Sequence, residues 1–516
     1  MVSEFKNEPY TDFSTPENQR KMQVALKSIS NQLGEEYDLV IGSQRVKTVE
    51  KFSSYNPSER GQVVGVFQKG TPKEAEAAVQ KAYQTFETWR RVQPTERAGY
   101  LFRAAEVMRR RRLELDAWMI LEEGKNWLEA DADVAEAIDF LEFYGREMLR
   151  LAGDQPLTRI PTEKSELVYI PLGVGVVIPP WNFPLAILVG MTSAAFVAGN
   201  TVVLKPSSDS PTMGAKFMEI LEEIGLPPGV VNFLTGSGAS VGDTLVGHAK
   251  TRFISFTGSK EVGLGIVELA AKTAPGQIWI KRVVAEMGGK DAIIVDHETD
   301  LEKAAQGVIA SAFGFQGQKC SACSRAIVVA QVYDQLLDLL REKAQAITVG
   351  PVIHQENYMG PVINQRAMES ILDYIEIGKK EGRLVCGGGP AVGNGFFIQP
   401  TIIADVDSRA RISQEEIFGP VLAVIKVRDF DHALEIANDS EYGLTGAVYS
   451  DNRDKIEKAK RVFHCGNLYI NRKCTGALVG VHPFGGFNMS GTDSKAGGRD
   501  YLLLYTQAKS ISEFVG

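Results

Sequence analysis

The chain has 516 residues, of which 44% are hydrophobic and 23% are charged. This composition is ordinary for a folded protein of two or three domains and excludes a disordered or fibrous chain. The net charge of −8 argues against nucleic acid or an anionic membrane surface as the main partner, because both bind to concentrated basic surfaces.

The cysteine content and the apolar runs indicate the cellular compartment of the protein. Five cysteines in so long a chain do not make a disulfide framework, and an odd number suits a reducing compartment. The N-terminal residues contain neither an apolar signal core nor an arginine-rich transit pattern. The longest apolar run, 185–197, is too short to cross a bilayer and predicts a buried helix. We therefore expect a cytoplasmic protein without a membrane partner.

The first 150 residues are predicted to be mainly helical after a short hairpin at 39–47. A helix should begin after Thr71, because a Thr-Pro start with Glu74 three residues after the threonine is typical of a capping box. More helices follow to about Leu149. The segment 151–165, rich in Pro, Thr and Gly, interrupts this pattern and is expected to be a connection or an arm.

From residue 173 onward, apolar β-branched runs alternate with helical segments. The first expected strands are 173–178, 201–204, 230–234 and 252–256. This alternation is typical of an open parallel sheet that is buried on both faces. Strands near Val283 and at 291–295 are expected to open a second series, which continues to Tyr469 and places Cys320 on a helix. The pattern thus predicts two α/β units of roughly 200 residues each, followed by a protruding strand at 501–514.

Cys320 lies in the stretch Gly317-Gln-Lys-Cys-Ser-Ala-Cys323, which suits a reactive thiol. A thiolate is the nucleophilic form of cysteine, and a nearby cation or oriented N–H groups lower the pKa of a thiol; Lys319 and a local turn could supply both. Taken alone, the stretch leaves two other interpretations open. Cys320 and Cys323 could be buried apolar residues, or a redox or zinc pair, although no further ligands stand at a suitable spacing. We predict no metal site.

Other candidate groups stand at strand ends, where open α/β sheets bind their ligands. Asn182 could donate its side-chain N–H to a developing oxyanion, or simply close a turn rich in proline. The turns at Lys205-Pro-Ser207 and Thr257-Gly-Ser259 suit the ribose and phosphate groups of a dinucleotide. Glu286 could act as a general base, or form an ion pair with Lys290.

A series of motifs, in order along nearly the whole chain, resembles the aldehyde dehydrogenase superfamily. These motifs are Pro180-Trp-Asn-Phe-Pro184, Lys205-Pro-Ser207, Phe256-Thr-Gly-Ser259, Glu286-Met-Gly-Gly-Lys290, Gly317-Gln-Lys-Cys320, Gln414-Glu-Glu-Ile-Phe-Gly-Pro420, and Pro483-Phe-Gly-Gly486 with Ser490-Gly491. Three more segments, 131–139, 317–325 and 471–480, resemble the branch of the superfamily that oxidises L-glutamate γ-semialdehyde.

The resemblance implies an α/β fold of the aldehyde dehydrogenase type. This fold has a Rossmann-type dinucleotide-binding domain (1–150 and 169–286), an α/β catalytic domain (287–487) and a β oligomerisation flap (151–168 and 488–516). Because such a flap adds strands to a partner subunit, we expect a homodimer or a larger homo-oligomer built from dimers.

The implied reaction is the NAD-dependent oxidation of L-glutamate γ-semialdehyde, which forms from 1-pyrroline-5-carboxylate, to L-glutamate in proline and arginine catabolism. Cys320 would attack the aldehyde carbon, and the Asn182 side chain and the Cys320 N–H would hold the oxyanion. After hydride transfer to nicotinamide, Glu286 would deprotonate the water that hydrolyses the thioester. Two alternatives stay open: another semialdehyde substrate, such as succinate semialdehyde, and a catalytically silent binding protein of this fold.

The same resemblance implies a set of cofactor contacts. They are Trp181 and Lys205 at the adenosine ribose, Gly258 and Ser259 at the pyrophosphate, Glu416 and Phe418 at the nicotinamide ribose, with Ile178, Pro179, Ser207 and Ser208 around them. NAD-selective relatives often carry a glutamate where this chain has Ser208. A 2′-phosphate would meet no carboxylate there, so we expect NAD as the main cofactor with NADP tolerated.

The small-molecule substrate would be bound by a second set of residues. In this set, Gly476, Ala477 and Ser321 bind the carboxylate, Glu136 lies near the amino group, and Phe183 and Phe484 flank the methylene groups.

Overall fold

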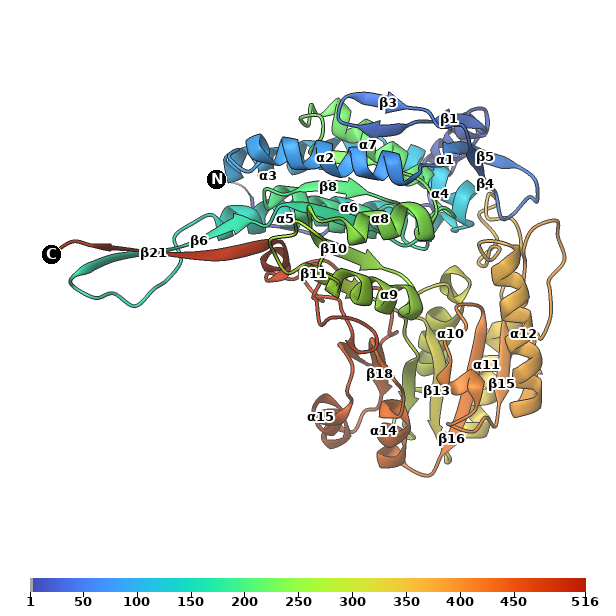
Figure 1. Cartoon of the computed structure of the whole chain (residues 1–516). Coiled ribbons are helices and arrows are strands. Elements are labelled where there is room, and N and C mark those ends of the chain that lie inside the picture. The colour runs from blue at the N-terminus through green and yellow to red at the C-terminus, as the bar shows by residue number, and fades with distance from the viewer. Residues whose placement is uncertain (1–2) are drawn as a thin grey trace.

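The computed structural model describes residues 3–516. Two α/β domains lie one above the other, and a long two-stranded ribbon projects to one side of them (Figure 1). Within the described residues, no helix combines the length and the apolar character needed to cross a membrane.

The sheet of the first domain has the strand order β11-β10-β7-β8-β9-β2-β3. The bounds are β11 Arg282–Glu286, β10 Thr251–Thr257, β7 Val174–Ile178, β8 Thr201–Leu204, β9 Val231–Phe233, β2 Leu39–Ile41 and β3 Gln44–Val46. Strands β11 to β9 are parallel, whereas β2 runs antiparallel to both β9 and β3. The predicted hairpin at 39–47 is confirmed, and it extends the edge of the main sheet.

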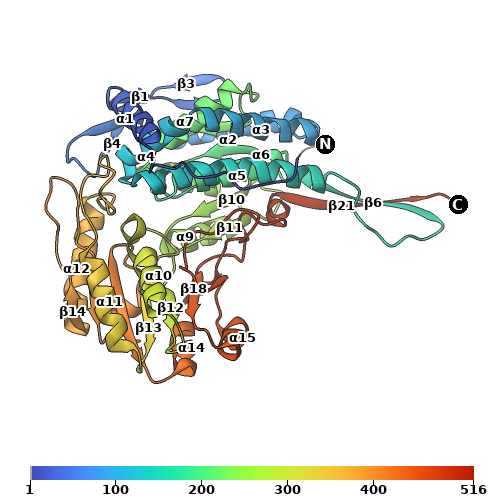
Figure 2. The same ribbon diagram turned by 180° about the vertical axis from the view of Figure 1, so that it is seen from behind.

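Helices cover both faces of this sheet, as the predicted alternation requires. On one face lie α2 (Pro72–Trp89), α8 (Asp243–Gly247) and α9 (Lys260–Ala271). On the other face, seen in Figure 2, lie α3 (Pro94–Arg110), α4 (Arg112–Glu123), α5 (Trp127–Leu151), α6 (Ala186–Val197) and α7 (Thr212–Glu223). The predicted capping box is confirmed, because Thr71 and Glu74 cap α2 reciprocally.

The N-terminal region adds a smaller layer to this domain. It consists of α1 (Pro16–Ser30) and a three-stranded sheet of order β1-β5-β4. The bounds are β1 Glu35–Tyr37, β5 Val63–Gln68 and β4 Lys51–Tyr55.

The sheet of the second domain has the order β14-β15-β16-β13-β12-β18-β19 and is parallel except for β14. The bounds are β14 Arg383–Cys386, β15 Thr401–Ala404, β16 Val421–Val427, β13 Cys323–Val329, β12 Asp291–Val295, β18 Thr445–Tyr449 and β19 Asn467–Ile470. Helices α10 (Leu301–Phe313) and α11 (Tyr333–Gln345) cover one face, and α14 (Phe430–Asn438) and α15 (Arg453–Val462) cover the other. Helices α12 (Gln365–Glu381) and α13 (Arg411–Gln414) pack over its β14 end.

One expected strand lies in a different sheet from the one predicted. The strand near Val283 was expected to open the second series, but as β11 it pairs with β10 and closes the edge of the first sheet. The chain crosses between the domains after Glu286, so the second series begins with β12. A run of apolar residues predicts a strand but not which of two sheets receives it.

The ribbon pairs β6 (Glu163–Pro171) with β21 (Thr506–Phe514) in antiparallel register. Strand β21 is mostly exposed and β6 is largely half-buried, and the ribbon extends beyond both domains (Figure 1). The preceding turn, Tyr501–Tyr505, instead packs into the core of the first domain, where Tyr501, Leu502 and Tyr505 are buried.

Candidate active site

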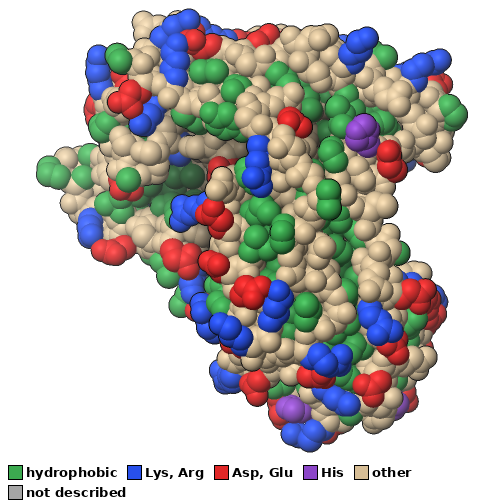
Figure 3. Space-filling model, turned by 90° about the vertical axis from the view of Figure 1, so that its right-hand side faces the viewer, with side chains coloured by type: hydrophobic (Ala, Val, Ile, Leu, Met, Phe, Trp, Pro, Cys, Tyr) green, Lys and Arg blue, Asp and Glu red, His purple; other side chains and the backbone are tan. Residues whose placement is uncertain are grey.

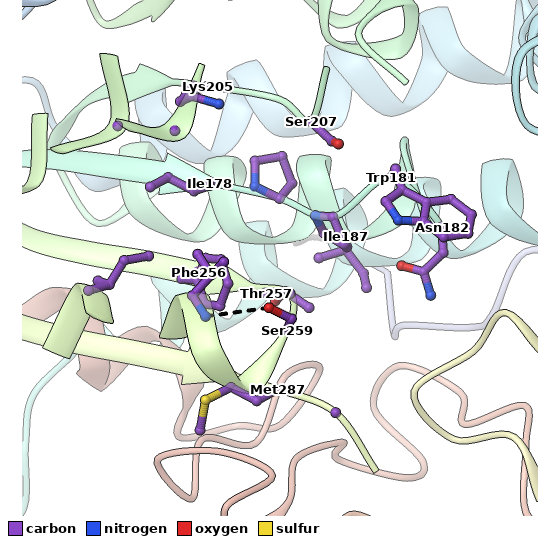
Figure 4. A pocket seen from close by; sticks show the side chains of 18 of the residues that line it. Ile178, Trp181, Asn182, Ile187, Lys205, Ser207, Phe256, Thr257, Ser259 and Met287 are labelled. Carbon is purple, nitrogen blue, oxygen red and sulfur yellow. Dashed lines mark hydrogen bonds between the residues drawn. The ribbon is translucent and has the colours of Figure 1, made fainter. Parts of the chain in front are cut away.

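A cleft of about 410 Å³ lies between the domains, at the carboxyl ends of β7, β8 and β10. Seen from the side, the molecular surface is hollowed between the two domains (Figure 3). All ten predicted cofactor residues line this cleft together with Asn182 and Cys320. In Figure 4, Lys205 and Ser207 lie on one side of it and Ser259 and Met287 on the other.

The parallel sheet explains why these segments, distant in sequence, meet. Parallel strands point their carboxyl ends to the same edge, so the turns that follow Ile178, Leu204 and Thr257 share one cleft. Ser259 caps α9 by accepting a hydrogen bond from the Val262 N–H (3.4 Å), and the first-turn N–H groups of this helix suit a pyrophosphate.

Lys205 is a buried cation beside the cleft. Its ammonium group has one long contact, 3.5 Å to the Pro206 carbonyl oxygen, and burial lowers its pKa to about 8. Its hydrogen-bonding capacity is therefore available for ribose hydroxyl groups.

Two glycines at the domain crossing permit the close approach of Glu416 and Cys320. A Cβ atom on Gly288 would lie 2.2 Å from a Glu416 carboxylate oxygen, and one on Gly289 would lie 2.4 Å from the Cys320 carbonyl oxygen. The Gly289 N–H donates to Glu416 at 3.0 Å. Burial raises the pKa of Glu416 to about 7.

The Phe418 ring packs edge-on against Trp181 with 5.5 Å between ring centres.

Cys320 lies in a turn, not on the helix where it was expected. Helix α10 ends at Phe313, and Phe315, Gln316 and Gly317 then all adopt left-handed backbone conformations, with φ of 47°, 58° and 69°. Such conformations cost of order 1–3 kcal/mol for a non-glycine residue and persist only where surrounding contacts hold them. Here the Gln316 side-chain amide donates to two carbonyl oxygens, of Gly124 (3.0 Å) and Pro361 (2.8 Å). This tight turn ends the helix and presents Cys320 to the cleft.

The surroundings of Cys320 disfavour its thiolate. Burial, followed by the charges of Asp291, Glu416 and Glu286, raises the pKa of the thiol well above its usual range, and the Ser321 N–H opposes this rise. The hypothesis that Lys319 activates the thiol is not supported, because its ammonium group forms an ion pair with Glu129.

Asn182 lies beside the turn that carries Cys320. Its side chain is buried, and Nδ2 donates to the carbonyl oxygen of Gln318, two residues before Cys320, at 3.0 Å. An amide nitrogen carries two N–H donors. The second donor is therefore available to a group bound beside Cys320.

Glu286 ends β11 and does not line the cleft. Its carboxylate accepts hydrogen bonds from the Gly486 N–H (3.2 Å) and from the Ser494 hydroxyl group. Burial raises its pKa to about 8, against the opposing effect of these donors. The side chain is near enough to Cys320 to influence the pKa of the thiol.

The six predicted substrate residues lie outside the lining of this cleft. Glu136 lies on α5, where burial raises its pKa to about 8. The Lys125 ammonium group lies 4.4 Å from the centre of the Phe183 ring. The Ser321 carbonyl oxygen accepts from the Cys474 thiol at 3.3 Å. Phe484 exchanges two backbone hydrogen bonds with Ala496, each 2.8 Å long.

Gly476 and Ala477 belong to a loop whose orientation is fixed by Arg472. The guanidinium group donates to the carbonyl oxygens of Thr475 and Gly476, each at 3.0 Å. Gly476 has a left-handed backbone with φ of 77°. The N–H groups of Gly476 and Ala477 have no acceptor among residues 3–516, so they are available to a carboxylate.

The cleft also contains residues that were not predicted from the sequence. They include Asp243 and Val246 on α8, Val262 and Ile266 on α9, Ile187 on α6, and Met287. The spacing of four between Val262 and Ile266 places both on one helix face, a signal that was present in the sequence.

Comparison with known proteins places the chain in a family. Residues 44–511 match the model of the aldehyde dehydrogenase family. Proteins named 1-pyrroline-5-carboxylate dehydrogenase from Geobacillus thermodenitrificans and Geobacillus kaustophilus are 59% and 60% identical, over 99% of this chain and 100% of their own length. The structure of a 1-pyrroline-5-carboxylate dehydrogenase from Thermus with bound NAD is 51% identical, with a TM-score of 0.98 over the full length of both chains. This chain belongs to the aldehyde dehydrogenase family and has its fold.

Proposed function

We propose that this chain oxidises L-glutamate γ-semialdehyde to L-glutamate with NAD as the hydride acceptor. The observation that carries the proposal is that Cys320 and Asn182 lie in one cleft with strand-end groups suited to a dinucleotide. The names of the Geobacillus and Thermus relatives support this choice of substrate and cofactor.

The cleft fits NAD in several respects. The Lys205 ammonium group would bind ribose hydroxyls, the N-terminus of α9 would face the pyrophosphate, and the Glu416 carboxylate would bind the second ribose. When bound, NAD supplies the hydride acceptor. Trp181 and Phe418, packed edge-on, form an apolar wall of the cleft.

The residues of the chain carry the remaining chemistry. The Cys320 thiol releases its proton to solvent and attacks the aldehyde carbon. The Asn182 amide and the Cys320 N–H stabilise the oxyanion, a contribution of about 3 kcal/mol for one such donor. Loss of hydride from this adduct leaves a thioester on Cys320. Glu286 then removes a proton from water, which attacks the thioester and releases the acid and the thiol.

At the other end of the substrate, a carboxylate and an ammonium group need partners. We assign the carboxylate to the free N–H groups of Gly476 and Ala477, with Ser321 beside them. Glu136 is assigned to the ammonium group, and Phe183 and Phe484 to the methylene groups between.

The proposal is tested by following NADH absorbance with pyrroline-5-carboxylate, with succinate semialdehyde and with a simple aliphatic aldehyde. We expect a clear preference for the first substrate and no signal from Cys320→Ala. Equal rates with the three substrates would contradict the assigned substrate, and an active Cys320→Ala variant would contradict the assigned nucleophile.

We also propose that the chain forms a homodimer, or a larger assembly of dimers, through the β6–β21 ribbon. Its exposed strand edges and the exposed Phe514 side chain, at 76% of full exposure, favour pairing with a second copy. Deletion of residues 506–516 should give monomers in sedimentation analysis, and an unchanged assembly would contradict this.

The five free cysteines support our proposal of a cytoplasmic location.

A further inference from the structure

Two consecutive residues, Ser494 and Lys495, contact the surroundings of Glu286 in different ways. The Ser494 hydroxyl group donates directly to one oxygen of the Glu286 carboxylate. The Lys495 ammonium group does not contact the carboxylate. It donates instead to the carbonyl oxygens of Gly485, at 2.6 Å, and Gly466, at 2.8 Å.

The peptide bond between Gly485 and Gly486 connects Lys495 to the second carboxylate oxygen. Its carbonyl oxygen accepts from Lys495 at 2.6 Å, and its N–H donates to Glu286 at 3.2 Å. In a trans peptide the C=O and N–H point in opposite directions, so this unit lies between an ammonium group and a carboxylate. The ammonium group polarises the peptide, which strengthens the N–H as a donor.

Close packing brings this peptide against its neighbours. A Cβ atom on Gly485 would lie 1.6 Å from the Ser494 carbonyl oxygen, and one on Gly466 would lie 1.8 Å from the Gly485 carbonyl oxygen. A Cβ on Gly491 would lie 3.1 Å from Glu286 Oε2. Glycine at these positions lets three backbone segments meet around the carboxylate.

We propose that Lys495 is a positioning residue for Glu286, acting through the peptide bond between Gly485 and Gly486, while Ser494 holds the other carboxylate oxygen. The inference rests on the proposed function, in which Glu286 is the base of thioester hydrolysis. Lys495 would thereby control the second half of the reaction without touching the substrate. The alternative is a purely structural role, in which the two hydrogen bonds of Lys495 only hold the backbone at Gly466 next to that at Gly485.

Other ionisable groups also influence Glu286. Lys495 favours its carboxylate form and Asp493 opposes it, and both effects are smaller than that of burial. Cys320, Tyr501 and Tyr505 also lie within electrostatic range of the carboxylate, but each is a neutral acid whose own pKa is raised. Lys495 is thus the cation whose removal should raise the pKa of Glu286.

The test compares Lys495→Met with Lys495→Arg in the full-length enzyme. Loss of the cation should weaken the stabilisation of the carboxylate, so the pH at which hydrolysis becomes fast should rise by about one unit. At pH 7 we expect steady-state turnover to fall about tenfold, with a first-turnover burst of about one NADH per active site. Lys495→Arg should keep the pH profile of the parent enzyme.

The pH profile separates a positioning role of Lys495 from a structural one, and Ser494→Ala provides a comparison. Ser494→Ala leaves the two Lys495 hydrogen bonds intact and should shift the pH profile in the same direction. An unshifted profile in Lys495→Met, even with a lower melting temperature, would overturn the inference. If Lys495→Met does not fold, Lys495→Gln, which keeps a donor without the charge, carries the same expectation and the same contrary outcome. Absence of NADH formation by the parent enzyme would instead contradict the proposed function itself.

Discussion

The ammonium group of Lys319 lies 2.7 Å from each carboxylate oxygen of Glu129, 190 residues away in the sequence. The pair is mostly buried, with side-chain exposures of 10% and 23%. It joins the first turn of α5 to the turn that carries Cys320. The charge of Lys319 is thereby neutralised next to Cys320, which leaves burial and the neighbouring carboxylates to disfavour the thiolate.

Removing the partner of Lys319 should therefore activate the thiol. In Glu129→Gln the ammonium charge is no longer compensated, so we expect iodoacetamide to alkylate Cys320 several times faster at pH 7 than in the parent enzyme. The second substitution in Glu129→Gln/Lys319→Met should abolish this increase. The same rate in the single and double variants would show that Lys319 is not the cause.

Thioester hydrolysis should depend on the protonation of Glu286. Because burial raises its pKa to about 8, the carboxylate form needed by a base increases as pH rises through that value. We expect steady-state turnover to rise with pH through about 8. Glu286→Gln should lower turnover by about 10² to 10⁴ and remove this dependence, but should still form NADH in the first turnover. Loss of the first turnover as well would contradict a role confined to hydrolysis.

Arg472 should determine affinity for a substrate that carries a carboxylate. Its two hydrogen bonds orient the loop that exposes the N–H groups of Gly476 and Ala477. In Arg472→Ala we expect KM for the semialdehyde to rise about tenfold, equivalent to about 1.4 kcal/mol, with little change in kcat. KM for an uncharged aliphatic aldehyde should stay the same, and an equal rise for both would point to general misfolding of the loop.

Position 208 should govern the choice between NAD and NADP. Ser208 lines the cleft and has no charge. Ser208→Glu would place a carboxylate near the 2′ position, so Kd for NADP should rise at least about tenfold through charge repulsion, while NAD binding should change little. Ser208→Gln is the matched uncharged control. Similar effects of both substitutions on NADP would indicate steric rather than electrostatic selection.

The order of elements and much of the cleft could be predicted from the sequence alone. Local patterns encode them: the capping residues Thr71 and Glu74 begin α2, and β-branched runs alternate with helices through both domains. Because parallel strands end at one edge, the turns after Ile178, Leu204 and Thr257 were expected to share a site, and they do.

Tertiary structure alone decided the partners of the charged groups and of one strand. Strand β11 joined the first sheet, Lys319 paired with Glu129, and Glu286 came to lie between Ser494 and the peptide bond after Gly485. Local periodicity predicts that a segment is a strand or that a side chain is polar. It does not say which distant segment completes the pairing, because hydrogen bonds and ion pairs depend on distances that only the folded chain sets.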